Sequence, residues 1–256
     1  MFAAASLRDA FGRLRDEFVH THPGLEIAFN FAGTQELRAQ LEQGAKADVF
    51  ASADQRNMGE LRKSSRVLEP VVFARNAPVV VVARERAALV PSFADLPHAA
   101  RIVLGVPDVP IGRYALEILD KASHLDAAYG GLGRDFRARV EAKVVSREPD
   151  VRQVLAKVSL GEADAGFVYR TDANGAKDRV VTLAIPEALN VLAEYPIAVV
   201  SDAEHAALAV EWVVFLTSSA GQALLQKSGF LSPAEPSTEL VPAVSKPAAP
   251  PAKTAT

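Results

Sequence analysis

Two strand-to-helix junctions near the start of the chain constrain its fold more than any other feature. They are Phe2-Ala-Ala-Ala-Ser6 and Asn30-Phe-Ala-Gly33-Thr34, and each places a hydroxyl residue where a helix is expected to begin. Serine and threonine favour this position because their side-chain oxygen accepts from an amide that has no partner inside the helix. The remaining amides and the positive end of the helix dipole face forward, so paired junctions of this kind predict an anion site.

Strand-like and helical segments alternate along most of the chain. Apolar residues recur at helical spacing from Leu7 to Phe18, which predicts an amphipathic helix ending near residue 22. We expect further helices at residues 34–43, 112–122, 150–160, 203–218 and 221–227, and strands at residues 25–31, 47–51, 77–83, 102–106, 140–145, 165–169 and 195–200. This alternation is typical of an α/β fold built on mostly parallel sheets.

The length and order of these segments fit two lobes better than one domain. We expect residues 1–80 to form the first part of lobe I, residues 81–194 to form lobe II and residues 195–232 to return to lobe I. The strands at residues 79–83 and 195–200 are expected to cross between the lobes. Residues 233–256 are rich in proline and alanine, a composition that cannot support a packed core, and we expect this tail to be disordered.

The overall charge offers no broad attraction to a polyanion. The chain of 256 residues has a net charge of −3 and contains no cysteine. Binding to nucleic acid or to an anionic membrane is therefore not expected, and an anion must be captured by local donors. Disulfides and thiolate metal sites are excluded, while the compartment stays open.

Other candidate sites carry less weight. The five histidines show no spacing with acidic residues that is typical of a metal centre, so we expect no metal ligands. Gly130-Gly-Leu-Gly133 lacks the strand, helix and third glycine of a dinucleotide loop, and a turn is the simpler interpretation. No nucleophile elbow is present, so we expect no catalytic residues and no cofactor.

Several sequence segments, which follow one another in the same order, resemble the periplasmic molybdate-binding proteins of bacterial ABC importers. The matching segments are residues 2–9, 30–41, 44–54, 109–115, 150–155, 161–169 and 195–200. The resemblance covers roughly residues 2–232 and rests on the set, since no single motif decides it. It implies a two-lobed, periplasmic-binding-protein-like (type II) clamshell, each lobe a mostly parallel sheet flanked by helices. It also implies a monomer that captures molybdate, and tungstate as well, and delivers it to a membrane permease without being an enzyme.

The resemblance also implies a set of binding residues. Ser6 and Thr34 would contact the oxyanion through hydroxyl and amide, Ile111 and Val151 through their amides, and Tyr169 through its phenol. Taken singly, each has a plainer interpretation as a helix cap, a core residue or a buried aromatic. Thr34 stands where the family usually has serine and keeps the hydroxyl. Ile111 stands where a small alanine is usual, and its bulk is expected to narrow the pocket.

Location and ligand leave alternatives open. No signal peptide precedes Met1, which begins inside the first expected strand; we expect a truncated start and an exported, periplasmic protein. One alternative keeps the class and changes the ligand to sulfate or another oxyanion. A second is the ligand-sensing domain of a regulator, although no helix-turn-helix is apparent. An enzyme on the same scaffold is the least supported, because no acid, base or nucleophile set accompanies the anion site.

Overall fold

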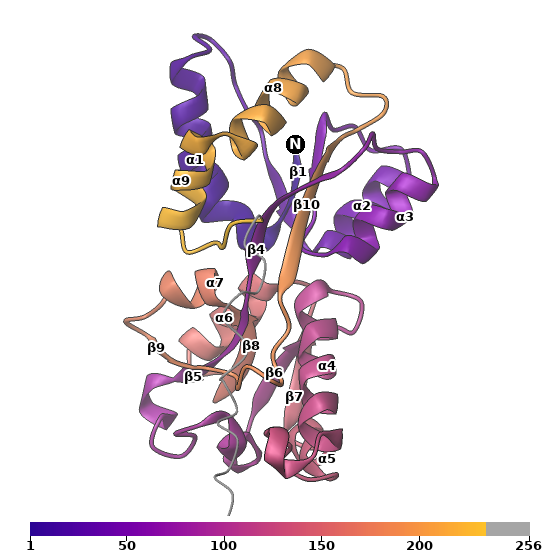
Figure 1. The fold of residues 1–256 in the computed structure, drawn as a ribbon. Coiled ribbons are helices and arrows are strands. Elements are labelled where there is room, and N and C mark those ends of the chain that lie inside the picture. Colours follow the sequence, from indigo (N-terminus) through magenta and orange to yellow (C-terminus); the bar gives the residue numbers. More distant parts are fainter. Residues whose placement is uncertain (234–256) are drawn as a thin grey trace, which may run out of the picture.

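The computed structural model describes residues 1–233, which form two lobes that each contain a five-stranded sheet (Figure 1). The sheet of lobe I has the order β2-β1-β3-β10-β4, with β1 (Phe2–Ala4), β2 (Asn30–Ala32), β3 (Val49–Ala51), β4 (Val71–Asn76) and β10 (Ala193–Val199). The sheet of lobe II has the order β7-β6-β8-β5-β9, with β5 (Pro78–Ala83), β6 (Ile102–Gly105), β7 (Val144–Glu148), β8 (Ala165–Tyr169) and β9 (Val180–Leu183). Apart from its first residue, the tail expected at 233–256 lies outside the described residues.

Helices flank both sheets. Lobe I contains the 3₁₀ turn η1 (Ala5–Leu7) and the helices α1 (Arg8–His20), α2 (Thr34–Glu42), α3 (Gln55–Lys63), α8 (Ala206–Thr217) and α9 (Ser219–Lys227). Lobe II contains α4 (Pro110–His124), α5 (Phe136–Glu141), α6 (Val151–Ser159) and α7 (Arg170–Asn174), with 3₁₀ turns at Arg84–Arg86, Phe93–His98 and Ala127–Tyr129. The predicted two-lobed α/β fold is confirmed.

The two sheets share one plan. In lobe I, β1 pairs in parallel with β2 and β3, whereas β10 runs antiparallel to both β3 and β4. In lobe II, β6 pairs in parallel with β7 and β8, whereas β5 runs antiparallel to both β8 and β9. Four strands of each sheet therefore point the same way and one is reversed. The sheets are mixed in their pairing, although most of their strands share one direction.

The reversed strands are the ones that follow each passage between the lobes. β4 ends at Asn76 in lobe I and β5 begins at Pro78 in lobe II, so Ala77 alone joins them. The return passage is residues 184–192, between β9 and β10. The expectation that strands 79–83 and 195–200 themselves cross between the lobes is wrong. β5 pairs with β8 from Pro78 onward and β10 pairs with β4 from Ala193 onward, so each strand belongs to one sheet.

Some expected strands are shifted or shortened. Where a strand was expected at 25–31, only Asn30–Ala32 forms one, although Met1 continues the contact by donating to the carbonyl of Ala28 at 2.8 Å and accepting from the amide of Asn30 at 2.9 Å. The strand expected at 140–145 is β7 at Val144–Glu148, because residues 136–141 form α5, which buries Phe136 and Val140. The strands β4 and β9 and the helix α3 were not predicted.

The buried faces of α8 and α9 belong to the core of lobe I, whereas Val210 and Val214 of α8 are exposed. Trp212 of α8 is fully buried and meets Phe11 of α1 edge-to-face, with ring centroids 5.6 Å apart. Among the described residues, no single helix is long and apolar enough to cross a membrane. α8 and α9 reach that length and composition only when counted together, and they are bent by 65° at the break between them.

Candidate anion-binding site

Four helix starts meet where the two lobes face each other. η1 follows β1 and α2 follows β2 in lobe I, while α4 follows β6 and α6 follows β7 in lobe II. Because the sheets share one plan, these junctions occupy equivalent places at the carboxyl ends of the strands, where ligands sit in open α/β sheets. The structure brings all five predicted residues to one cavity, namely Ser6, Thr34, Ile111, Val151 and Tyr169.

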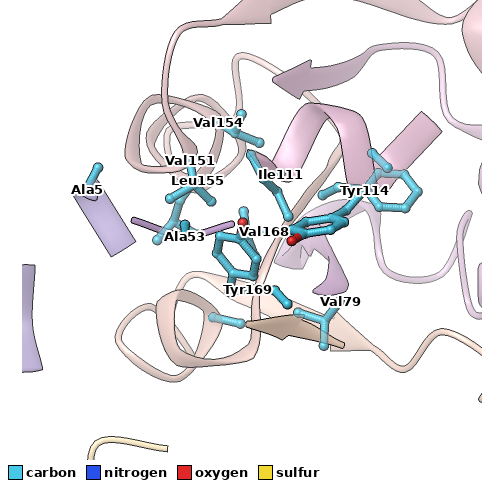
Figure 2. Packing of buried hydrophobic residues seen from close by; sticks show 14 of the residues in the cluster. Ala5, Ala53, Val79, Ile111, Tyr114, Val151, Val154, Leu155, Val168 and Tyr169 are labelled. Carbon is cyan, nitrogen blue, oxygen red and sulfur yellow. The ribbon is translucent and has the colours of Figure 1, made fainter. Parts of the chain in front are cut away.

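The cavity is small and well covered. Its volume is about 10 Å³, whereas pockets for organic ligands measure roughly 300–1,000 Å³. Figure 2 shows the ring of Tyr169 among Ala53, Ile111 and Val151, which come from both lobes. All five predicted residues are buried, with exposed fractions of 1% to 4%. The space is close to that of a single water molecule, so the lobes as they stand in this structure exclude organic ligands.

The hydroxyls of Ser6 and Thr34 do not cap their helices. The capping position of α2 is Gly33, and neither η1 nor α2 has a side-chain cap. Ser6 Oγ lies 3.0 Å from Tyr195 Oη, and Thr34 Oγ1 accepts from the amide of Ala53 at 3.2 Å. The capping role expected from the sequence is wrong, because Ser6 is engaged by Tyr195 of β10 and Thr34 by the amide of Ala53, which follows β3. The first-turn amides of both elements consequently lack a side-chain partner from their own cap.

Lobe II presents backbone amides at apolar residues. Val109 caps α4 without a side-chain hydrogen bond, and Pro110 occupies the first helical position, so Ile111 provides the next amide. In α6, Asp150 is the capping residue and Val151 is the first helical residue. Amides at these positions have no acceptor within the helix. Both can therefore donate to a ligand in the cavity, where their apolar side chains also exclude water.

Asp150 is a cavity-lining residue that sequence analysis did not include in the site. Its Oδ1 accepts from the amides of Arg152 at 2.7 Å and Gln153 at 3.1 Å, and its Oδ2 accepts from Gln153 Nε2 at 2.8 Å. The carboxylate is thus turned toward its own helix. It satisfies the second and third helical amides and leaves the amide of Val151 as the donor of that turn.

Tyr169 ends β8 and contributes a phenol to the cavity. Its hydroxyl is buried and has no hydrogen-bond partner among the described residues. Burial raises the pKa of Tyr169 well above its ordinary value, so the phenol stays protonated and keeps its donor. A buried hydroxyl without a partner carries a free-energy cost, which a bound acceptor would remove.

The cations nearest the site are paired with carboxylates of the other lobe. Arg113 of α4 donates to the buried Asp54 of lobe I at 2.9 Å, and Arg152 of α6 pairs with Asp9 of α1. Arg152 Nε also lies 3.1 Å from Asp172, whose pKa is raised by burial to about 7 despite the opposing charge of Arg152. An anion in the cavity would therefore be balanced by dipoles and hydroxyls rather than by a free cation.

The backbones of the two lobes come close together beside Gly33. The side chain of Gln35 in lobe I donates to the carbonyl oxygen of Pro149 in lobe II at 2.8 Å. A Cβ added to Gly33 would lie 2.3 Å from the same oxygen, a distance that real side chains do not show. Glycine at this position therefore permits closure, a role that the sequence motif did not reveal.

Comparisons with known proteins agree with the fold. The family described as bacterial extracellular solute-binding protein matches residues 1–231. The chain belongs to this family. It is also 38% identical over 235 residues to the molybdate-binding protein ModA of Mycobacterium tuberculosis (strain ATCC 25618 / H37Rv), with 91% of this chain and 84% of that protein covered.

Two further comparisons extend this result within the solute-binding family. The chain is 32% identical over 217 residues to the molybdate-binding protein ModA of Escherichia coli (strain K12), which covers 80% of this chain and 78% of that protein. The periplasmic molybdate-binding protein of Azotobacter vinelandii has the same fold, with a TM-score of 0.76 at 18% identity over 91% of this chain and 98% of that one. The predicted membership of a solute-binding protein family is confirmed.

Proposed function

We propose that this solute-binding protein captures molybdate, and tungstate as well, between its lobes and delivers it to the permease of an ABC importer. The observation that carries the proposal is the buried cavity at which four helix starts, two hydroxyls and one unpartnered phenol converge. Molybdate is a tetrahedral dianion that offers only acceptors, so a lining of donors suits it. The similarity to ModA proteins over most of the chain supports the same ligand.

In this proposal the contacts are divided between the lobes. Ser6 and Thr34 donate through hydroxyl and amide, Ile111 and Val151 donate through their amides, and Tyr169 donates through its phenol. The lobes, divided at Ala77 and at residues 184–192 rather than near residues 80 and 194, close over the ion, and the protein acts as a monomer. The chain binds and releases its ligand without chemical change, and it works outside the cytoplasmic membrane, as the family description suggests.

Isothermal titration of the purified chain against molybdate, tungstate, sulfate and phosphate tests the proposal. Molybdate and tungstate are expected to bind with similar affinity, because the two ions are nearly equal in size and charge. Sulfate is expected to bind more weakly, because it is smaller and cannot reach all donors at once. Phosphate retains a proton near neutral pH, and that proton needs an acceptor. Equal affinity for molybdate and phosphate would contradict the proposed ligand, and a preference for sulfate would replace it.

A further inference from the structure

The hydroxyl of Ser6 forms a hydrogen bond with Tyr195, a residue that does not line the cavity. Ser6 Oγ and Tyr195 Oη lie 3.0 Å apart, and both residues are buried. A bond between two hydroxyls has two possible directions. If Ser6 donates, its lone pairs face the cavity and repel a dianion. If Tyr195 donates, the proton of Ser6 is left to point into the cavity.

The acidity of the two hydroxyls favours the second direction. A phenol is more acidic than an aliphatic hydroxyl and is therefore the stronger donor. Asn76 is a further neighbour of Tyr195, and Asn76 and Ser6 both oppose the effect of burial on the Tyr195 pKa. The side chain of Asn76 is itself held in place, because its oxygen accepts from the amide of Ala77 at 3.0 Å and its Nδ2 donates to Thr171 Oγ1 at 2.8 Å.

Tyr195 also keeps its proton over the working range of pH. Burial raises the pKa of Tyr195 well above its ordinary value, and the charge of Asp172 acts in the same direction. The groups that face the phenol are Ser6 and Asn76 by hydrogen bond, with Tyr114 contributing a smaller repulsion. The phenol therefore stays protonated and keeps a proton that it can donate to Ser6.

We infer that Tyr195 is a positioning residue that turns Ser6 into a donor to the anion: Tyr195 donates to Ser6, and Ser6 donates to the ligand. The hydroxyl of Thr34 is oriented in the same way by the backbone, because the amide of Ala53 donates to it at 3.2 Å. This inference rests on the proposed function. It gives Tyr195 a specificity role, since a Ser6 hydroxyl that gives one lone pair to Tyr195 and points its proton into the cavity favours an oxyanion without a proton.

The test is a double-mutant cycle between Tyr195→Phe and Ser6→Ala, with molybdate and phosphate as titrants. Tyr195→Phe frees Ser6 to turn, and we expect molybdate affinity to fall about three- to tenfold while phosphate affinity holds or rises. Ser6→Ala is expected to reduce molybdate affinity about ten- to a hundredfold. Because Tyr195 acts through Ser6, adding Tyr195→Phe to Ser6→Ala should change molybdate affinity by less than twofold, which is roughly the scatter of additive pairs.

Three variants separate positioning from packing. Tyr129→Phe, at a residue 70% exposed, is the matched control and should bind like the parent. Tyr169→Phe should weaken molybdate and phosphate alike. Asn76→Asp places an acceptor beside Tyr195 that competes with Ser6 for the phenol proton, and it should relax the selectivity as Tyr195→Phe does, which keeps the test valid if Tyr195→Phe folds poorly.

Two results would overturn the inference while the proposed function stands. One is an equal loss of molybdate affinity from Tyr195→Phe in the parent and in the Ser6→Ala background, which would mean that Tyr195 acts through packing. The other is an unchanged ratio of phosphate to molybdate affinity in both Tyr195→Phe and Asn76→Asp. A parent chain that binds no molybdate would instead overturn the proposed function, and this inference with it.

Discussion

The two lobes have the same sheet plan but equip their shared cavity differently. Ser6 follows β1 in lobe I, and Ile111 follows the equivalent strand β6 in lobe II. Thr34 follows β2 in lobe I, and Val151 follows the equivalent strand β7 in lobe II. Lobe I thus adds side-chain hydroxyls to its backbone amides, and lobe II relies on amides and one phenol. A donor in a side chain can be deleted by ordinary mutation, whereas an amide donor persists through every substitution except proline.

The largest effect is expected where the lobes touch, because closure brings the two donor sets together. Gly33→Ala leaves the extended backbone of Gly33 unstrained but directs a Cβ at the carbonyl of Pro149. We expect molybdate affinity to fall by about a hundredfold or more, since incomplete closure loses more than one hydrogen bond to the ion. Titration measures the loss.

Gly12→Ala provides the matched control for this prediction. A Cβ at Gly12, in the middle of α1, meets nothing within 4 Å, so this variant should bind molybdate like the parent. The melting temperature without ligand should be similar in both variants, because the clash at Gly33 arises between the lobes. A Gly33→Ala variant that retains the parent's affinity would show that this approach is not needed for binding.

The next largest effect tests whether lobe II binds the anion through backbone amides. Val151→Pro removes the N–H of Val151 at the first helical position of α6, where proline is tolerated. The preceding Asp150 has φ −149° and ψ 165°, an extended conformation that proline accepts in its neighbour. Loss of one donor to a charged ligand should lower affinity up to about a hundredfold.

Val151→Ala separates the amide from the side chain in that experiment. It shortens the side chain and keeps the N–H, so affinity should change by no more than about threefold, the scale of losing part of a packed surface. Titration of both variants under one set of conditions decides the point. If Val151→Ala binds as weakly as Val151→Pro, lobe II contributes packing at this position rather than an amide donor.

Tyr169→Phe removes the one side-chain donor that lobe II contributes. The hydroxyl is lost while the ring stays, and affinity should fall on the order of ten- to a hundredfold. Without ligand the melting temperature should barely change, because the hydroxyl has no partner among the described residues. The rise in melting temperature on adding molybdate should shrink. Undiminished molybdate binding by this variant would remove Tyr169 from the site.

The fold was predictable where strands are buried on both faces. β8 at Ala165–Tyr169 was predicted to the residue, and all five of its residues are buried. The strands that sequence analysis missed, β4 and β9, lie at the edges of their sheets and expose some of their residues. An edge strand buries less apolar surface, so its hydrophobic pattern is weaker.

The site was predictable as a set of residues but not as a set of contacts. The five residues implied by the resemblance line one cavity. The partners that define their roles were not predictable, because they depend on contacts between distant segments: Tyr195 lies 189 residues from Ser6, and the carbonyl of Pro149 lies 114 residues from its donor Gln35. Local patterns predicted caps at Ser6 and Thr34, whereas the tertiary structure uses those hydroxyls elsewhere.

The smallest effect concerns an ion pair that joins the lobes beside the site. Asp9 of lobe I pairs with Arg152 of lobe II, its side chain is 50% exposed, and Arg152 keeps Asp172 as a second partner. Asp9→Asn should therefore lower molybdate affinity only about two- to fivefold, the range of exposed ion pairs, and the loss should shrink as salt rises. Asp16→Asn, which breaks a pair with Arg15 within α1, should leave affinity unchanged.

A loss above about tenfold for Asp9→Asn would exceed what an exposed pair supplies and would mean that closure depends on charge as much as on donors to the ion. Equal affinity of Asp9→Asn and the parent at low salt would mean that the lobes are held together by the ligand and the close approach at Gly33 alone.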